Sequence, residues 1–185
     1  EIKLLKHLHG QETEKGLPLI RYFYPEKEAK DFQKLLKVAK ERHINFFWAI
    51  HLGNFKDEYD ALFAKLDSMY ALGVRSFAIF FDDFGSANAE LHSTIGNRVI
   101  KEFLAKKGDC SPLLICPNVY WGYGHPYQKE LGAKLDKSAM IMWTGKSICS
   151  DVRAEDVAKI TADFQRPPFI WWNCPVNDYC RSIVL

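Results

Sequence analysis

Apolar runs of strand length alternate with amphipathic segments of helix length along most of this chain. The helical segments carry apolar residues at a spacing of three and four, and the runs between them are almost continuously apolar, as in strands covered on both faces. This alternation predicts βαβ units, which form a parallel sheet with right-handed crossovers. The predicted strands are 44–50, 74–81, 112–116, 140–143 and 169–172, and the predicted helices are 26–42, 57–72, 89–107, 128–135 and 154–164.

The fold class follows from what accompanies these units. No GxGxxG or GxxxxGK[ST] sequence follows a predicted strand, which argues against dinucleotide-binding and P-loop folds and leaves a (β/α)8 TIM-type barrel. Such a barrel typically needs about 250 residues. The 185 residues therefore predict an incomplete barrel of five to six β/α units, with a possible sixth strand at 19–23 and a need for the rest of the parent barrel. Residues 1–20 show no clear period and match the β/α pattern poorly. The predicted division is therefore an N-terminal segment, 1–20, and a partial barrel, 21–185.

Composition excludes several classes of protein. A hydrophobic share of 48% and a charged share of 26% are typical of globular chains. The 25 basic and 23 acidic residues are mixed along the chain, so no basic patch for nucleic acid is expected. No apolar run reaches 18 residues, so no membrane span is expected, and nothing indicates a compartment. Five cysteines without CxxC spacing are expected to be reduced structural thiols, and His51 has no HxH or HExxH partner, so neither a metal nor another cofactor is expected.

Polar and aromatic residues follow the predicted strands, where a barrel carries its chemistry. Two adjacent carboxylates, Asp82 and Asp83, end the second predicted strand, and the later strand ends add amides, a tyrosine and tryptophans. Flat aromatic faces beside directional hydrogen-bonding groups suit a sugar, whose C–H faces are apolar and whose hydroxyls need partners. The strand ends therefore indicate a carbohydrate site.

Each of these residues also has a plainer interpretation. Asp82 and Asp83 reach one site only if the chain turns there, which Gly85 permits, and one of the two is then expected to hold a proton and act as a donor. Otherwise they are solvated loop acids, or one of them caps the next helix. Trp171 and Trp172 point to opposite faces of a strand, so at most one lines the barrel mouth, and Trp48 is expected in the core. Asn173 and Asp178 are also ordinary turn residues.

Four segments in this order and spacing resemble glycoside hydrolase family 84, the O-GlcNAcases and bacterial hyaluronidase-type β-N-acetylglucosaminidases. They are FAIFFDD at 77–83, CPNVY at 116–120, IMWTG at 141–145 and FIWWNCPVNDY at 169–179, supported by YPEKEA at 24–29 and WAIH at 48–51. The resemblance implies a (β/α)8 catalytic barrel without a cofactor. It also implies removal of terminal β-linked GlcNAc from a glycoprotein or glycan with retention of configuration, in which the 2-acetamido group of the substrate is the nucleophile.

The resemblance also implies roles for individual residues. Asp83 matches the general acid/base, and Asp82 matches the residue that orients and polarises the acetamido N–H. The substrate-binding residues matched are Tyr120, Thr144, Ile148, Trp171, Asn173 and Asp178. The family also carries a lysine before the Tyr24-Pro25-Glu26 segment, and this chain has none aligned with it. A non-catalytic sugar-binding protein or pseudo-enzyme of the same barrel is therefore the alternative.

Overall fold

The computed structural model describes residues 4–8, 19–21, 23–52, 55–83 and 85–173, and within them it contains one six-stranded parallel sheet. The strand order is β1-β2-β3-β4-β5-β6, so each strand pairs with the next one along the chain. A doubly wound sheet reverses its order at a switch point, whereas a barrel does not. The partial barrel predicted from the sequence is therefore confirmed. The strands are β1 Leu4–Leu8, β2 Phe47–His51, β3 Ser76–Phe80, β4 Leu114–Cys116, β5 Met140–Trp143 and β6 Phe169–Ile170.

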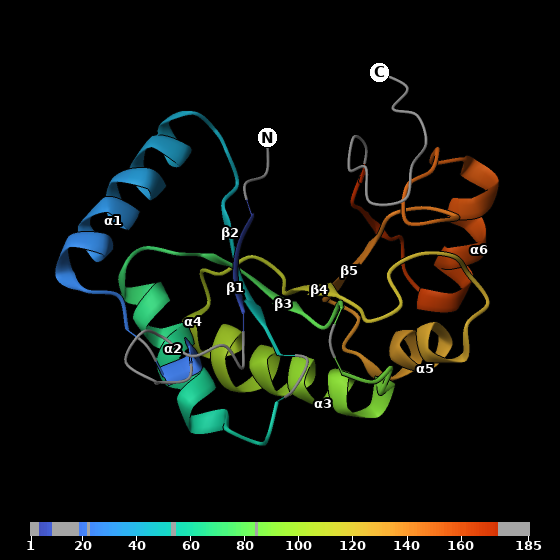
Figure 1. Ribbon diagram of the computed structural model, residues 1–185, viewed down its shortest axis with the longest axis horizontal. Coiled ribbons are helices and arrows are strands. Elements are labelled where there is room, and N and C mark those ends of the chain that lie inside the picture. The colour runs from blue at the N-terminus through green and yellow to red at the C-terminus, as the bar shows by residue number, and fades with distance from the viewer. Residues whose placement is uncertain (1–3, 9–18, 22, 53–54, 84, 174–185) are drawn as a thin grey trace.

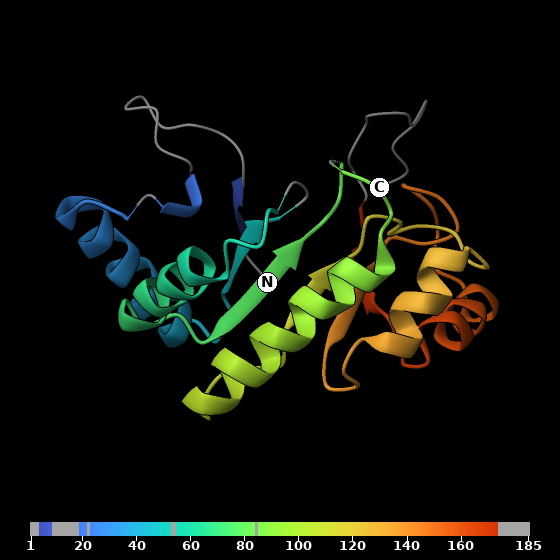
Figure 2. The same cartoon turned by 90° about the horizontal axis from the view of Figure 1, so that it is seen from below.

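The helices form an arc around the outer side of this sheet, and Figure 2 shows them side by side in front of the strands. In Figure 1 the arc runs from α1 through α2 and α3 to α5 and α6. Their bounds are α1 Glu26–Glu41, α2 Tyr59–Ala71, α3 Ala89–Val99, α4 Ala105–Lys107, α5 Pro126–Lys134 and α6 Ala154–Phe164. A π-helical turn, η2 at Ile100–Leu104, joins α3 to α4, so the predicted helix 89–107 is continuous but has one wide turn.

The two faces of the sheet pack into two separate apolar clusters. Side chains alternate between the faces along each strand. The outer cluster, between the sheet and the helices, contains Trp48, which is fully buried as predicted. The inner cluster would fill the barrel interior and consists of Phe47, Ala49, Ala78, Phe80, Leu114, Cys116 and Met142, with Tyr120, Met140, Phe169 and Trp171 packed against it. Because both faces are covered, the strands read as continuous apolar runs rather than as an alternating pattern.

Arg166 ties the end of α6 to the end of α5. The residue is only 8% exposed, and the five N–H groups of its side chain all donate to backbone carbonyls. The acceptors are the carbonyl oxygens of Gly132, Leu135, Asp136, Ala139 and Phe164, at 2.5–3.1 Å. Since the last carbonyls of a helix have no partner within the helix, the guanidinium supplies donors where α5 lacks them.

The first residues of the chain differ from the prediction. The strand predicted at 19–23 is wrong, because Leu19–Arg21 forms a short 3-10 helix, η1. The sixth strand is β1 instead, within the segment that showed no period, and it pairs with β2 from Leu4 opposite Phe47 to Leu8 opposite His51. A domain boundary at residue 20 stays a prediction.

Membrane spans and cysteines are two further features on which the composition gave an expectation. None of the described helices is long and apolar enough to cross a membrane. Among the described residues, Cys110, Cys116 and Cys149 form no disulfide bond with one another. Cys174 and Cys180 lie outside the described residues.

Candidate active site

Asp82 lies buried at the carboxyl end of β3. It continues the alternation that places Ala78 and Phe80 on the inner face of the sheet, and it is 1% exposed. His51, at the end of the neighbouring strand β2, has its Nε2 atom 3.6 Å from the Asp82 carboxylate oxygen Oδ1, and it also makes a short hydrogen bond to the Asp82 carbonyl oxygen. The inner face therefore ends in a carboxylate held beside an imidazole.

Asp83 differs from its neighbour in exposure and in backbone conformation. Its side chain is exposed, and its φ of 62° places it in the left-handed region, which aspartate tolerates better than most residues. The chain thus turns at this point, as predicted, and Gly85 follows with a φ of 77°. The helix-cap alternative is wrong, because Asn88 caps α3 by accepting a hydrogen bond from the backbone N–H of Leu91 at 3.0 Å. The alternative of a solvated acid describes Asp83 but not Asp82.

Tyr120 and Trp171 form an aromatic pair on the inner side of the sheet. Their ring centroids lie 5.6 Å apart at an interplanar angle of 42°, and both rings pack against the inner cluster. Trp171 is partly buried and Trp172 is 72% exposed, so only the first of the two tryptophans faces the barrel mouth, as predicted. The two members of the pair come from the ends of strands far apart in the sequence.

Thr144 connects this pair to the end of β5. It is fully buried, and its backbone N–H donates to the Tyr120 carbonyl oxygen at 3.0 Å. Its hydroxyl donates to the carbonyl oxygen of Ser147 at 3.2 Å. Thr144 therefore fixes both the segment that carries Tyr120 and the loop that follows β5.

Asn173 and Ile148 also contact one another. The side-chain amide of Asn173 donates to the Ile148 carbonyl oxygen at 3.1 Å, and Asn173 is buried. This residue is thus more than a local turn residue, because it holds a loop 25 positions earlier. Asp178 lies outside the described residues, and its place in the site stays a prediction.

The loop between β4 and α5, which carries Tyr120, is anchored by side chains that bind its backbone carbonyls. The buried Gln128 side chain lies within hydrogen-bonding distance of three loop carbonyls, those of Val119, Trp121 and Gly122, at 3.0–3.4 Å. The indole N–H of Trp143 donates to the Gly122 carbonyl oxygen at 2.7 Å. The loop is therefore held by side chains from α5 and β5.

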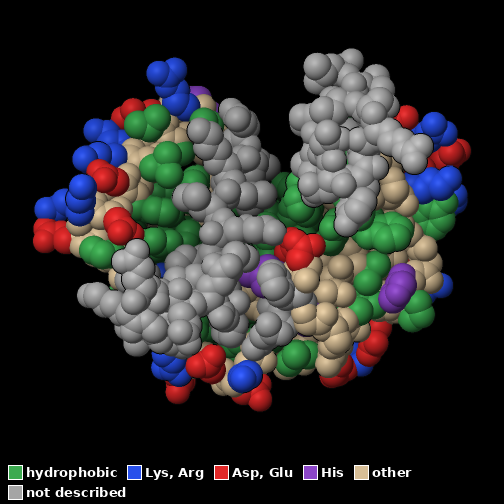
Figure 3. Space-filling view, in the orientation of Figure 1, with side chains coloured by type: hydrophobic (Ala, Val, Ile, Leu, Met, Phe, Trp, Pro, Cys, Tyr) green, Lys and Arg blue, Asp and Glu red, His purple; other side chains and the backbone are tan. Residues whose placement is uncertain are grey.

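His51 is the residue of this site that the sequence did not assign. It lacks a sequence neighbour of metal-ligand type, and its partner is 31 positions away. The available signal was positional, because His51 ends β2 as Asp82 follows β3. Among the described residues no group of three or more His, Cys, Asp or Glu side chains could hold a metal ion. Figure 3 shows acidic side-chain atoms beside a histidine near the middle of the face that it draws, with hydrophobic side chains next to the acidic atoms.

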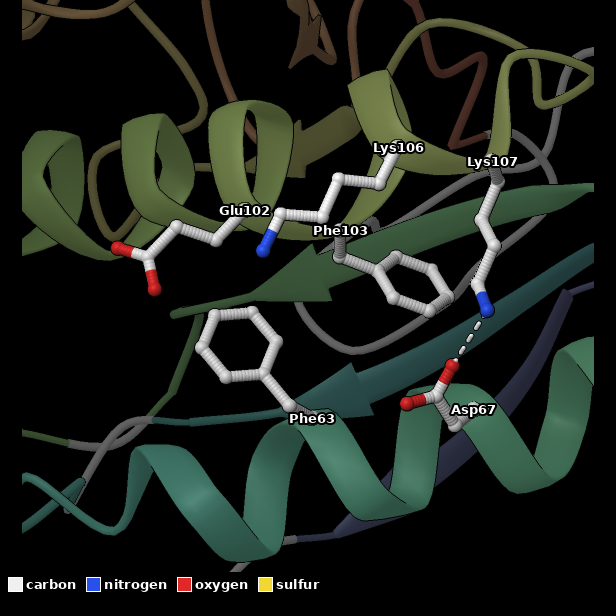
Figure 4. Close-up of a pocket in the computed structure, with 6 residues that line it drawn as sticks. All are labelled: Phe63, Asp67, Glu102, Phe103, Lys106 and Lys107. Carbon is white, nitrogen blue, oxygen red and sulfur yellow. Dashed lines mark ion pairs between the residues drawn. The ribbon is translucent and has the colours of Figure 1, made fainter.

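A groove of about 270 Å³ lies elsewhere, on the helical side of the molecule. It is lined by Phe63 and Asp67 of α2 and by residues of the wide turn and α4, with an ion pair of 2.7 Å between Lys107 and Asp67 (Figure 4). None of the predicted site residues lines it. The groove is therefore separate from the strand ends that carry the two carboxylates.

The curated relatives of this chain include two protein O-GlcNAcases. The protein O-GlcNAcases of Rattus norvegicus and Mus musculus are 30% and 31% identical over 179 aligned residues, which cover 86% of this chain. The alignment covers 20% of each relative, so the chain spans about a fifth of their length.

Solved structures agree in sequence and in fold. The structure of CpGH84B superposes with a TM-score of 0.81 at 33% identity, covering 94% of this chain and 34% of that one. A mutant of the Thermobaculum terrenum O-GlcNAc hydrolase superposes with a TM-score of 0.78 at 28% identity, covering 86% of this chain and 38% of that one. The profile of the β-N-acetylglucosaminidases matches residues 20–185. The resemblance carried by the four motifs is thereby confirmed, and the chain belongs to the β-N-acetylglucosaminidases of glycoside hydrolase family 84.

Proposed function

We propose that this chain forms most of the catalytic barrel of a retaining β-N-acetylglucosaminidase, which removes terminal β-linked GlcNAc from a glycoprotein or glycan. The observation that carries the proposal is the unequal setting of two adjacent carboxylates. Asp82 is buried on the inner face beside His51, and Asp83 is exposed on a left-handed turn. Neighbouring acids in different environments suit two different tasks in one reaction.

In the proposed reaction the sugar supplies its own nucleophile. The acetamido carbonyl oxygen attacks C1 as the bond from C1 to the aglycone oxygen breaks, so no enzyme carboxylate forms a covalent bond. Asp82 accepts a hydrogen bond from the acetamido N–H. As a carboxylate it also stabilises the positive charge of the oxazoline ring. Asp83 gives its proton to the departing oxygen, and it then takes a proton from the water that opens the oxazoline.

The remaining predicted residues would bind the sugar. Tyr120 and Trp171 offer aromatic surface at the mouth of the barrel, and Tyr120 would also help to fold the acetamido group beneath C1. Thr144 and Ile148 would line the space for the acetyl methyl group. Asn173 keeps its side-chain oxygen for a sugar hydroxyl, since its N–H₂ group donates to Ile148, and Asp178 would accept hydrogen bonds from further hydroxyls.

The names of the relatives suggest the substrate class. Rat and mouse relatives are protein O-GlcNAcases, so GlcNAc on protein is the first substrate to test. Because the described sheet has six strands and a closed barrel of this type has eight, we propose that activity also requires the strands that complete the barrel. Experiments on activity should therefore use the full-length gene product.

The test separates the tasks of the two carboxylates with a series of aryl β-GlcNAc substrates whose leaving groups differ in basicity. Asp83→Asn should retain more activity on good leaving groups, which need little protonation, than on poor ones. Asp82→Asn should impair all members of the series alike, since it acts on the nucleophile. Equal losses for both variants across the series would contradict the assignment.

The alternative, a sugar-binding protein without catalysis, comes from the resemblance, in which the lysine that the family carries before the Tyr24-Pro25-Glu26 segment has no match in residues 8–13. Steady release of a fluorescent leaving group from an aryl β-GlcNAc would exclude it. Tight binding of a thiazoline mimic of the oxazoline, with no turnover of any substrate, would support it instead.

A further inference from the structure

A cluster of three residues, of which His92 and Tyr127 are buried and Asn118 is partly buried, connects the ends of β3 and β4 behind the candidate site. The hydroxyl of Tyr127, at the start of α5, accepts a hydrogen bond from the backbone N–H of Asn118 at 3.1 Å and lies 2.8 Å from Nδ1 of His92 on α3. Tyr127 and His92 are each 3% exposed. We call His92, Asn118 and Tyr127 the His92 cluster.

The direction of these hydrogen bonds follows from the surroundings. Burial lowers the pKa of His92 to about 4, and burial also raises the pKa of the Tyr127 phenol. At neutral pH the imidazole is therefore neutral and the phenol keeps its proton. The Tyr127 oxygen accepts from the Asn118 N–H, and its O–H is available to donate to His92 when Nδ1 carries no proton.

The cluster contacts both segments that carry the reacting groups. The side-chain amide of Asn118 donates to the carbonyl oxygen of Phe81 at 3.0 Å, and Phe81 directly precedes Asp82. The ring of Phe81 stacks on the His92 imidazole, with centroids 3.9 Å apart and planes within 5°. On the other side, Asn118 lies two residues before Tyr120. The buried Tyr127 hydroxyl thus fixes Asn118, and Asn118 joins the end of β3 to the segment that carries Tyr120.

We propose that Tyr127 and His92 are positioning residues, which act through Asn118 and Phe81 to hold Asp82 and Tyr120 at the separation that closure of the oxazoline ring requires. This inference rests on the proposed function. Neither residue contacts the sugar site directly, and both lie on the helical side of the strands. Their effect on rate would come from geometry, because a displacement of about 1 Å between reacting groups can cost about a hundredfold in rate.

The experiment compares Tyr127→Phe with Tyr123→Phe in the full-length gene product. Tyr127→Phe keeps the ring and removes the hydroxyl that binds Asn118 and His92. Tyr123 lies four residues before Tyr127, on the loop between β4 and α5, but its hydroxyl accepts from exposed Lys159 on α6 and has no part in the cluster, so it is the matched control. Each variant is examined by hydrogen exchange with mass spectrometry and by steady-state kinetics.

Hydrogen exchange reports on position without any catalysis. The Thr144 N–H donates to the Tyr120 carbonyl, so its exchange rate measures how firmly the Tyr120 segment is held. In peptides that contain Thr144, exchange should be about tenfold or more faster in Tyr127→Phe and unchanged in Tyr123→Phe. Unchanged exchange in Tyr127→Phe would overturn the inference.

Kinetics then test the effect on the reaction. Tyr127→Phe should lower kcat about tenfold with KM within about twofold of the wild type, since ground-state binding of the sugar is kept. Faster exchange together with a wild-type kcat would also overturn the inference, because the cluster would then be structural only. A wild-type protein that hydrolyses no substrate would refute the proposed function, and with it the catalytic part of this inference, while the exchange measurement would still decide whether the cluster holds Tyr120.

A second pair of variants covers the case in which Tyr127→Phe does not fold. His92→Asn keeps an acceptor near the position of Nδ1, whereas His92→Leu removes it, and both lose the stacked ring. The Thr144 amide should exchange more slowly in His92→Asn than in His92→Leu. Equal rates in these two variants would count against a role for the Tyr127–His92 hydrogen bond.

Discussion

Replacing Arg166 with methionine should remove the connection between α5 and α6 while keeping the length and the apolar stem of the side chain. All five donors of the guanidinium bind backbone carbonyls, and none of these acceptors is a carboxylate. Burial lowers the pKa of Arg166, which reflects the cost of holding a charge in this place. The stabilisation is thus a sum of charged hydrogen bonds reduced by a desolvation penalty.

The magnitude can be bounded from these contacts. A hydrogen bond to a charged group contributes about 1.5–3 kcal/mol, so five of them have a gross value of about 7–15 kcal/mol. Desolvation of a buried ion costs several kcal/mol, and water would reach part of the vacated space. We therefore expect Arg166→Met to lower the free energy of unfolding by about 3–5 kcal/mol. Arg166→Lys has three donors for five acceptors and should lose about half as much.

Urea unfolding followed by circular dichroism and by tryptophan fluorescence measures this loss. With a slope of about 2 kcal/mol per molar urea, a loss of 4 kcal/mol moves the midpoint by about 2 M. The control is Arg153→Met, whose side chain is 65% exposed and whose nearest carboxylate oxygen, on Asp151, is 3.8 Å away. This variant should change the free energy by under about 0.5 kcal/mol. A loss below about 1 kcal/mol in Arg166→Met would refute the reasoning.

Three further predictions concern packing, charge and edges. A Cβ at Gly132 would lie 2.4 Å from the Asp163 carbonyl oxygen, so Gly132→Ala should cost about 2 kcal/mol or more in urea unfolding. Gly96→Ala should cost less, because the nearest atom to its Cβ, at 2.8 Å, is a terminal methyl of the Leu135 side chain, which can shift more easily than backbone. Burial lowers the pKa of Lys65 from 10.5 to about 8, so between these pH values the unfolded chain binds more protons than the folded chain. The free energy of unfolding should therefore rise from pH 8 to 10.5 in the wild type but not in Lys65→Met. Within the described sheet β1 and β6 each pair on one side only, so residues 1–185 expressed alone should self-associate in ultracentrifugation; a stable monomer would show that these edges are protected.

The sequence predicted best those elements whose ends are marked by residues nearby in the sequence, such as a proline that cannot continue a helix. The strand 140–143 and the helix 154–164 have the predicted bounds, and Pro167 and Pro168 follow that helix closely. β1 was missed because Lys6 and His7 interrupt its apolar character. Its pairing with β2 is a contact between residues more than forty positions apart, which local propensity does not record.

In the candidate site, too, the features set by local sequence were predictable and those set by contacts between distant residues were not. Its location was predictable, because a barrel places polar residues at the carboxyl ends of its strands. Strand parity also explains the orientation of Asp82, since it shares a face with Ala78 and Phe80. The contacts of His51 with Asp82 and of His92 with Tyr127 join residues 31 and 35 positions apart, so they depend on the packing of whole elements.

The anchoring of the loop that carries Tyr120 has a consequence for the speed of ligand binding. Gln128 and Trp143 bind its carbonyls from the protein interior, so the loop loses its conformational freedom when the protein folds. Ordering a free loop during binding would cost on the order of 1 kcal/mol for each residue. A sugar that reaches this surface meets groups already in place, so association should follow a single exponential whose rate rises in proportion to sugar concentration, without a slower step of loop closure.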